Sequence, residues 1–562
     1  MQGRAAFRAV LLLSIAASAA GIGWGLPSVM GWAPDELIPA EVLAAARRHF
    51  GGGWHHVYPP FHFYLLAAAY APVLAVTGTP VADTGQELWR RQWPGGAYLA
   101  LFVIGRVLSL LMAAGALMAV HKAALLTAGR AGAAFAALAL ALSLPFAFYS
   151  RLANVDVPYV FWFALALLAY VRILARHDLK DYLAFAASAV LSVCSKDQAW
   201  ALYPLPAVHV LLALRRERER RGAPAGLRDV VSDQRVVSSA LLAGFVFLVA
   251  QNIPFNAAGF AAHVGVVTGP LNRDLQMFDR TLAGEWRMAR LTVSLLGFAL
   301  GPPALLASAA GLVRALLARP RPTLLLAAAL PAVSYAVFFL APVLVGYDRF
   351  MLPLCVVAAL FAGYAVSGGG LPAAVRGPLM IAVAAYGILR VAALGLAMQK
   401  DARYAAEDWL AANVRPGQQV AAVGPLAYLP RVQRFDWVHA APSLAALDRL
   451  RPDFVVLNAE YAERPEDGAA RDFYETLGRG GAGYRRAFDY RHPAPALVDL
   501  RWWIAGREGY TNLAKVNPRV LVFERELQRD AVAEDVHGGR RRAAVSRDER
   551  QAVDVDDPGQ QQ

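Results

Sequence analysis

Two acidic and two basic positions stand at the ends of apolar stretches in this chain. They are the pair Asp35-Glu36 in GWAPDELIPAEV, Asp156 in SRLANVDVP, Lys196 in VCSKDQAW and Arg349 in VGYDRFMLPL. Carboxylates beside cations at a bilayer boundary fit a reaction on an amphiphile with an anionic head group, such as a sugar linked to a lipid phosphate. The cations would bind the phosphate and stabilise charge developing on it, and a carboxylate would accept the proton of an attacking hydroxyl. Direct displacement by that hydroxyl inverts the anomeric carbon and needs no carboxylate nucleophile.

Each of these residues also has a structural alternative. Asp35 could cap a helix over 36–49, and Asp156 could cap the helix that follows it. Lys196 and Arg349 could be anchors that extend from helix ends to the membrane surface.

Arg106 and Arg390 lie inside apolar stretches, where an ionisable residue suggests function. Both are close enough to a helix end for their side chains to reach the surface instead. Asp348 could pair with its neighbour Arg349.

The composition excludes a soluble protein. Of 562 residues, 57% are hydrophobic and only 17% are charged, whereas soluble domains carry about 25% charged residues. The formal net charge of +13 comes largely from Lys and Arg beside apolar runs, which indicates membrane orientation rather than nucleic-acid binding. Cys194 and Cys355 lie in apolar runs, so neither a structural disulfide nor a thiolate metal site is expected.

Apolar runs long enough to span a bilayer predict a polytopic α-helical membrane protein with about eleven transmembrane helices. The first lies within residues 1–25 and is expected to remain uncleaved. The others are 97–120, 131–149, 157–175, 181–195, 198–214, 236–252, 291–317, 323–343, 350–366 and 377–398.

The basic clusters determine the expected orientation. If the apolar run 61–79 lies along the outer surface, the block RRERERR at 215–221 and three other basic loops fall on the cytoplasmic side. If 61–79 crosses the membrane, all four loops fall outside. We therefore expect 61–79 to be interfacial, the N-terminus inside and the C-terminus outside.

The last part of the chain changes in character. Residues 1–400 form the membrane region, with an outer loop over about 27–96, and residues 401–527 alternate helical and β-rich runs typical of a small α/β domain. Strands are expected at 419–424, 453–458 and 519–526. The charged, Gln-rich stretch 528–562 is expected to be disordered.

With these motifs in place, residues 5–400 resemble the GT-C membrane glycosyltransferases that use polyprenyl-phosphate sugars, above all the protein O-mannosyltransferase and aminoarabinose-transferase group. PDE (34–36), YPPFHFYLL (58–66), SRLANVDVP, SKDQA and DRFMLPL follow the order of that family's motifs. By this resemblance Asp35 would be the catalytic base, with Glu36 and Asp156 supporting it or holding a metal. Lys196 and Arg349 would contact the lipid phosphate.

One position departs from the family pattern. Many relatives have a basic residue before the Pro-Pro pair, where this chain has Tyr58. His55, His56 or His62 could supply the missing phosphate contact, and Arg106 is a further candidate.

The resemblance implies a polyprenyl-phosphate sugar donor, a lipid, glycan or protein acceptor, and a multi-pass location in the bacterial inner membrane with the site outside. No cofactor is certain, although Asp35, Asp156 and His55 could hold a divalent cation. The alternative is a transporter or flippase. Transporters place their sites near the bilayer midplane and show repeats, whereas the candidate residues here lie at the boundary.

Overall fold

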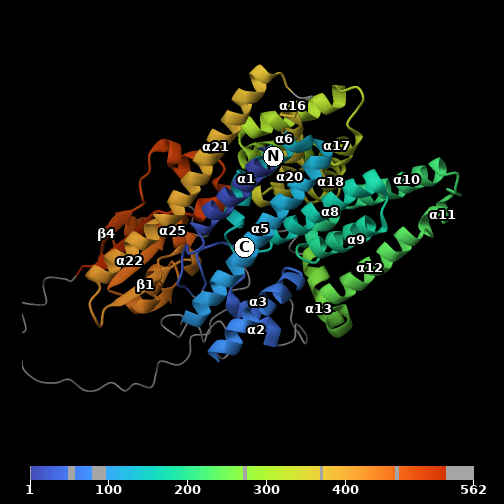
Figure 1. Cartoon of the computed structure of the whole chain (residues 1–562). Coiled ribbons are helices and arrows are strands. Elements are labelled where there is room, and N and C mark those ends of the chain that lie inside the picture. The colour runs from blue at the N-terminus through green and yellow to red at the C-terminus, as the bar shows by residue number, and fades with distance from the viewer. Residues whose placement is uncertain are drawn as a thin grey trace, which may run out of the picture.

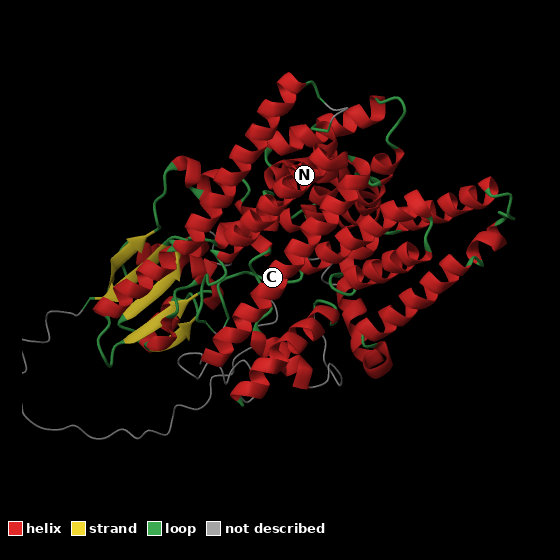
Figure 2. Ribbon diagram, in the orientation of Figure 1, coloured by secondary structure: helices red, strands yellow, loops and turns green. Residues whose placement is uncertain are grey.

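The computed structural model describes residues 2–28, 30–47, 57–78, 96–269, 275–367, 371–462 and 468–526. Figure 1 shows a large helical region with a smaller domain at one end, and Figure 2 shows that the described strands gather in this smaller domain. His55, His56 and the tail 528–562 lie outside the described residues.

The helical region contains α-helices and short 3-10 or π turns. Its elements are α1 (Gln2–Ala19), α2 (Pro39–Arg47), α3 (Phe61–Thr77), α5 (Gly96–Thr127), α6 (Gly129–Ala141), α7 (Leu144–Tyr149), α8 (Asp156–Arg176), α9 (Leu179–Val193), η1 (Asp197–Leu202), α10 (Pro204–Arg220), α11 (Leu227–Val231), α12 (Gln234–Ala250), α13 (Ile253–Thr268), α15 (Leu282–Leu300), α16 (Pro302–Leu317), α17 (Thr323–Ala327), α18 (Leu330–Tyr335), η2 (Ala336–Leu340), α19 (Ala341–Val343), η3 (Asp348–Met351), α20 (Leu352–Ala365) and α21 (Ala373–Gln399).

Each of the eleven predicted spans contains helix, but the number of spans is not confirmed. Among the described residues, five helical segments are long and apolar enough to cross a membrane, or up to seven if each of two bent pairs is one span. The predicted span 291–317 is wrong as a single straight helix, because the chain bends by 113° between α15 and α16. Gly301, at φ +82°, precedes Pro302, and a residue before proline is disfavoured in the helical conformation.

The stretch between the predicted spans 236–252 and 291–317 is also largely helical in its described part. Residues 253–268 form α13, which begins with Pro254 in its first turn, a position that suits proline because its missing N–H has no helical partner there. This segment is bent by 77° from α12.

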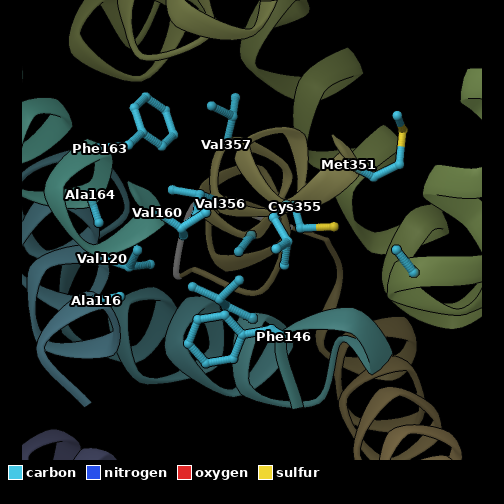
Figure 3. Packing of buried hydrophobic residues seen from close by; sticks show 14 of the residues in the cluster. Ala116, Val120, Phe146, Val160, Phe163, Ala164, Met351, Cys355, Val356 and Val357 are labelled. Atoms are coloured by element: carbon cyan, nitrogen blue, oxygen red, sulfur yellow. The ribbon is translucent and has the colours of Figure 1, made fainter. Parts of the chain in front are cut away.

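Apolar side chains from several helices form the core of the helical region. Figure 3 shows Val120 of α5, Phe146 of α7, Val160 of α8 and Val356 of α20 facing one another. Small residues bring backbones close here, as in membrane helix packing. A Cβ added at Gly363 of α20 would lie 2.5 Å from the carbonyl oxygen of Gly132 in α6.

This close approach predicts a stability effect. The substitution Gly363→Ala should lower the free energy of unfolding by about 1–3 kcal/mol, because backbone atoms cannot move aside for the added methyl. Thermal unfolding in detergent measures the loss. Gly395→Ala in α21 is the matched control, since nothing lies within 4 Å of its Cβ, and we expect no destabilisation from it. Equal behaviour of the two variants would contradict the packing argument.

The smaller domain is an α/β unit. A five-stranded sheet has the order β2-β1-β3-β5-β4, with β1 parallel to β2 and β3, and β5 antiparallel to β3 and β4. The strands β1 (Gln419–Val423), β3 (Phe454–Asn458) and β5 (Val520–Arg525) confirm the predicted ones, whereas β2 (Asp436–Ala440) and β4 (Tyr484–Tyr490) were not predicted. The other elements are α22 (Ala402–Asn413), η4 (Leu426–Tyr428), η5 (Val432–Arg434), α23 (Leu444–Leu450), α24 (Ala459–Ala462), α25 (Gly468–Gly478), η6 (Ala496–Val498), α26 (Leu500–Ile504), η7 (Glu508–Tyr510) and η8 (Asn512–Lys515).

A buried polar network fastens this domain to the loop between α1 and α2. Asp401 accepts hydrogen bonds from Trp24 Nε1 at 3.1 Å and from the guanidinium of Arg403. That guanidinium also lies 4.1 Å from the ring centroid of Trp32. The loop that carries Asp35 and Glu36 is therefore held from the side of the α/β domain.

Candidate active site

Asp35 lies in the loop between α1 and α2 and points to a basic residue 314 positions away. Its carboxylate Oδ2 accepts from Nη1 of Arg349 and from Nδ2 of Asn512, the latter at 3.1 Å. The backbone at Asp35 has φ +57°, a conformation that Asp tolerates better than most residues. The capping alternative for Asp35 is wrong, because α2 begins only at Pro39 and the carboxylate has other partners. The side chain remains 26% exposed, so a substrate can reach it.

Asp156 and Lys196 form a second, more deeply buried pair. Lys196 Nζ lies 2.5 Å from Asp156 Oδ1, and Asp156 Oδ2 accepts from Asn154 Nδ2 at 3.2 Å. Although Asp156 is the first residue of α8, its side chain does not cap that helix. Its role as a simple helix cap is therefore also wrong.

Aromatic rings surround both cations. Lys196 Nζ lies between 5.4 and 5.9 Å from the ring centroids of Tyr58, Tyr159 and Phe350. The guanidinium of Arg349 lies 5.6 Å from the same Phe350 ring. Rings at this range stabilise a cation and keep bulk water away from it. Tyr58, which replaces the family's basic residue, thus contacts Lys196 and also hydrogen-bonds Arg349.

The two ion pairs act on each other electrostatically, so they form one cluster of two carboxylates and two cations. Burial raises the pKa of Asp35, but Arg349 and Asn512, together with Lys196, outweigh burial and hold that pKa below its usual range. Asp35 is therefore ionised at neutral pH. An ionised carboxylate beside two cations can accept a proton, and the cations can bind an anion.

Glu36 and Arg106 form a separate buried brace. Nε and Nη2 of Arg106 each donate to the Glu36 carboxylate at 2.7 Å, and Nη1 donates to the carbonyls of Ile22 and Trp24. Glu36 also accepts from the backbone N–H of Ala153 at 3.1 Å. In this structure Arg106 therefore uses its donors within the protein rather than on a phosphate, and Glu36 holds the loop that carries Asp35.

His62 is not brought into the cluster as a charged group. It is fully buried in α3, and neither ring nitrogen has a hydrogen-bond partner among the described residues. A neutral imidazole in an apolar setting would not balance a phosphate charge.

The described residues contain no group of three His, Cys, Asp or Glu side chains that could hold a metal ion. The carboxylate of Asp35 pairs with Arg349, and that of Asp156 pairs with Lys196. Both carboxylates therefore have a cationic side chain as their partner in this structure.

The sequence did not reveal what the α/β domain contributes. Besides Asn512 on Asp35, Thr511 Oγ1 donates to Asp348 Oδ2 at 2.7 Å. The Tyr347 hydroxyl donates to Asn512 Oδ1 at 3.2 Å. Thr511 and Asn512 of the α/β domain therefore lie at one side of the site. Only the polar pair Thr511-Asn512 within an otherwise ordinary stretch could have drawn attention to it.

Comparisons with known proteins agree with the resemblance seen in the sequence. Residues 100–224 match the profile of the family described as dolichyl-phosphate-mannose-protein mannosyltransferase. This match confirms the expected resemblance over a segment that includes Asp156 and Lys196. A search of curated protein sequences finds no match.

Solved structures with a similar fold include two transferases. ArnT from Cupriavidus metallidurans bound to undecaprenyl phosphate is 14% identical, with a TM-score of 0.46 and coverage of 92% of this chain and 97% of that one. The oligosaccharyltransferase of Archaeoglobus fulgidus is 12% identical, with a TM-score of 0.43 and coverage of 92% and 88%. This chain is a multi-pass membrane protein.

Proposed function

We propose that this protein is a membrane glycosyltransferase that moves a sugar from a polyprenyl-phosphate carrier to an acceptor hydroxyl. The observation that carries the proposal is the cluster in which Asp35 contacts Arg349 and Asp156 contacts Lys196. The family match over residues 100–224 supports the same class of reaction. The acceptor is a lipid, a glycan or a protein.

In the reaction, the phosphate of the donor binds between Lys196 and Arg349. Because Arg349 then turns toward the phosphate, the Asp35 carboxylate becomes available to the acceptor hydroxyl. The acceptor oxygen forms a bond to the anomeric carbon while the bond from that carbon to the phosphate oxygen breaks. The proton passes to Asp35, and the departing phosphate keeps the electron pair, which the two cations stabilise. The anomeric configuration inverts.

The other acidic residues have supporting roles in this scheme. Asp156 holds the Lys196 ammonium in position with the help of Asn154. Glu36 fixes the loop next to Asp35 through Arg106. Neither touches the reacting atoms.

We place the membrane region at residues 1–400 and the α/β domain at 401–527, with the site and this domain on the outer face of the bacterial inner membrane. The charge pattern of the connecting loops supports this orientation. The α/β domain reaches the site through Asn512, which is consistent with both lying on one side of the membrane.

The test is transfer by purified protein in lipid vesicles, with a polyprenyl-phosphate donor that carries a labelled sugar. Label that becomes covalently attached to an acceptor supports a transferase. Label that only crosses the vesicle membrane while still bound to its carrier would support the flippase alternative and contradict the proposal.

Asn512 gives a pH prediction. Its amide donates to the ionised form of Asp35 and helps to hold the pKa of that carboxyl down, so Asn512→Ala should raise the Asp35 pKa. A base must be ionised to act, so the acidic limb of the kcat/KM profile should move to higher pH, with activity lost below that limb and little changed above it. The exposed Asn413 of α22, replaced in the same way, is the control. An unmoved limb would contradict a role for Asn512 in positioning or charging Asp35.

A further inference from the structure

The bend between α15 and α16 carries a cavity apart from the cluster described above. Its volume is about 240 Å³, and its walls include Phe298, Tyr386, Arg390, Trp503 and Arg507. Three parts of the chain meet here: the bend from α15 into α16, the middle of α21, and α26 with the residues that follow it. Figure 1 shows α21 running between the helical region and the α/β domain.

Two guanidinium groups flank one aromatic ring in this cavity. Arg390 lies 5.5 Å and Arg507 lies 5.8 Å from the centroid of the Phe298 ring. Arg390 is only 2% exposed. Its terminal nitrogens donate to the carbonyls of Phe298 and Ala299 at the end of α15, and these neutral partners do not balance its charge.

Neither guanidinium pairs with a carboxylate among the described residues, and the Nε of each has no hydrogen-bond partner there. This differs from the cluster, in which Lys196 and Arg349 each contact an Asp. Two adjacent buried or half-buried positive charges without a counter-ion are costly. The arrangement is therefore complementary to an anion.

The surroundings indicate a lipid as the source of that anion. The rings of Tyr386 and Trp503 meet edge to face at 5.0 Å, and tryptophan and tyrosine are the side chains enriched at the head-group level of a membrane. Val293 in the cavity wall is 63% exposed and the neighbouring Trp502 is 54% exposed. Apolar surface and aromatic rings beside a charged pocket suit an amphiphile better than a soluble ion.

We propose that this cavity binds the phosphate of a membrane lipid between Arg390 and Arg507. The lipid chains would lie along the exposed apolar face of α15, and the head group would join α21 to the segment after α26. The site is separate from the cluster of Lys196 and Arg349 and does not depend on the transferase proposal.

The experiment measures lipid retention by the full-length protein with native mass spectrometry. The probes are dioleoyl phosphatidic acid, diolein (the same chains without phosphate) and inorganic phosphate. Arg507→Gln should weaken binding of the phosphatidic acid about tenfold or more, as expected for losing a charged hydrogen bond. Arg507→Lys should retain part of the affinity. Arg479→Gln is the control, because Arg479 is exposed just after the end of α25 and pairs with Glu475.

Repeating the titration in an Arg349→Gln background separates this cavity from the cluster. A loss caused by Arg507→Gln in that background supports the proposal, and so does poor binding of diolein. Equal binding by wild type and Arg507→Gln would overturn it. Complete displacement of the lipid by inorganic phosphate at similar concentration would show a soluble-anion site and would overturn the assignment to a lipid. Transfer activity is not used as a readout, so failure here and failure of the transferase proposal are distinguishable.

Discussion

The variant Asp35→Asn is expected to lower the rate of sugar transfer by a hundredfold or more. The amide keeps the size of the side chain and can still accept a hydrogen bond from Arg349, but it cannot take the proton of the acceptor hydroxyl. Positioned general bases typically contribute 10²–10⁴ in rate. Transfer of labelled sugar under saturating donor measures the effect.

Donor binding by Asp35→Asn should not fall with the rate. In wild type, Arg349 must break its ion pair with Asp35 before it binds the donor phosphate. The variant has no such ion pair, so the affinity of the protein for the donor should stay the same or increase. A variant that is slow yet binds donor well identifies a group acting in the chemical step.

The control for Asp35→Asn is Asp178→Asn. Asp178 lies 3.7 Å from Lys180 on the surface, with 45% of its side chain exposed, and exposed pairs of this kind contribute little. Thermal unfolding of both variants checks that the fold is intact. If Asp35→Asn transfers sugar as fast as wild type, Asp35 is a structural partner of Arg349 and the base must be sought elsewhere in the site.

The cluster could be predicted because the ends of helices are easy to recognise in an apolar chain. An apolar run begins or ends at each of the four residues Asp35, Asp156, Lys196 and Arg349. The distribution of basic loops predicted that these helix ends lie on the same side of the membrane. The structure brings the four together, although Asp35 and Arg349 are 314 residues apart. What the sequence could not show was which carboxylate pairs with which cation.

Glu36 and Arg106 illustrate that limit. Both looked like members of the site, one as the neighbour of Asp35 and the other as a charge within an apolar helix. Instead, the two side chains form a bidentate ion pair with each other at 2.7 Å. This pairing depends on how α5 packs against the loop after α1. No periodicity in either segment encodes that packing.

The missed elements have local causes. The strands β2 and β4 are the two edge strands of the sheet and have partly exposed, polar sequences, DWVHA and YRRAFDY, so they lack the apolar runs that revealed β1 and β3. The bend at Gly301 was hidden because the apolar residues continue on both sides of it. The role of Asn512 could not be predicted because its partner, Asp35, lies near the other end of the chain.

The second large effect is expected at the buried pair of Asp156 and Lys196. Lys196→Gln alone removes the proposed phosphate contact and also leaves the buried Asp156 charge without its cationic partner. We expect transfer to fall 10²- to 10³-fold and the free energy of unfolding to fall by about 3–5 kcal/mol. The single variant therefore cannot separate catalysis from stability.

The double variant Asp156→Asn with Lys196→Gln makes that separation. Two neutral amides can hydrogen-bond across the 2.5 Å contact after a small relaxation, so most of the lost stability should return, as when both members of a buried pair are replaced together. Transfer should remain 10²- to 10³-fold below wild type, because the cation that binds the leaving phosphate is still absent. Thermal unfolding and labelled-sugar transfer, measured on the same preparations, give the two readouts.

The brace of Glu36 and Arg106 supplies the matched comparison, since both of its side chains are fully buried. There stability and activity should return together in the double variant Glu36→Gln with Arg106→Gln, because the brace only holds the loop. The return should be partial, because a glutamine cannot also donate to the carbonyls of Ile22 and Trp24. If the Asp156 and Lys196 double variant behaved in that way as well, Lys196 would be a second brace rather than a phosphate contact. The donor would then be held by Arg349 alone, and a single cation would have to stabilise the charge of the departing phosphate.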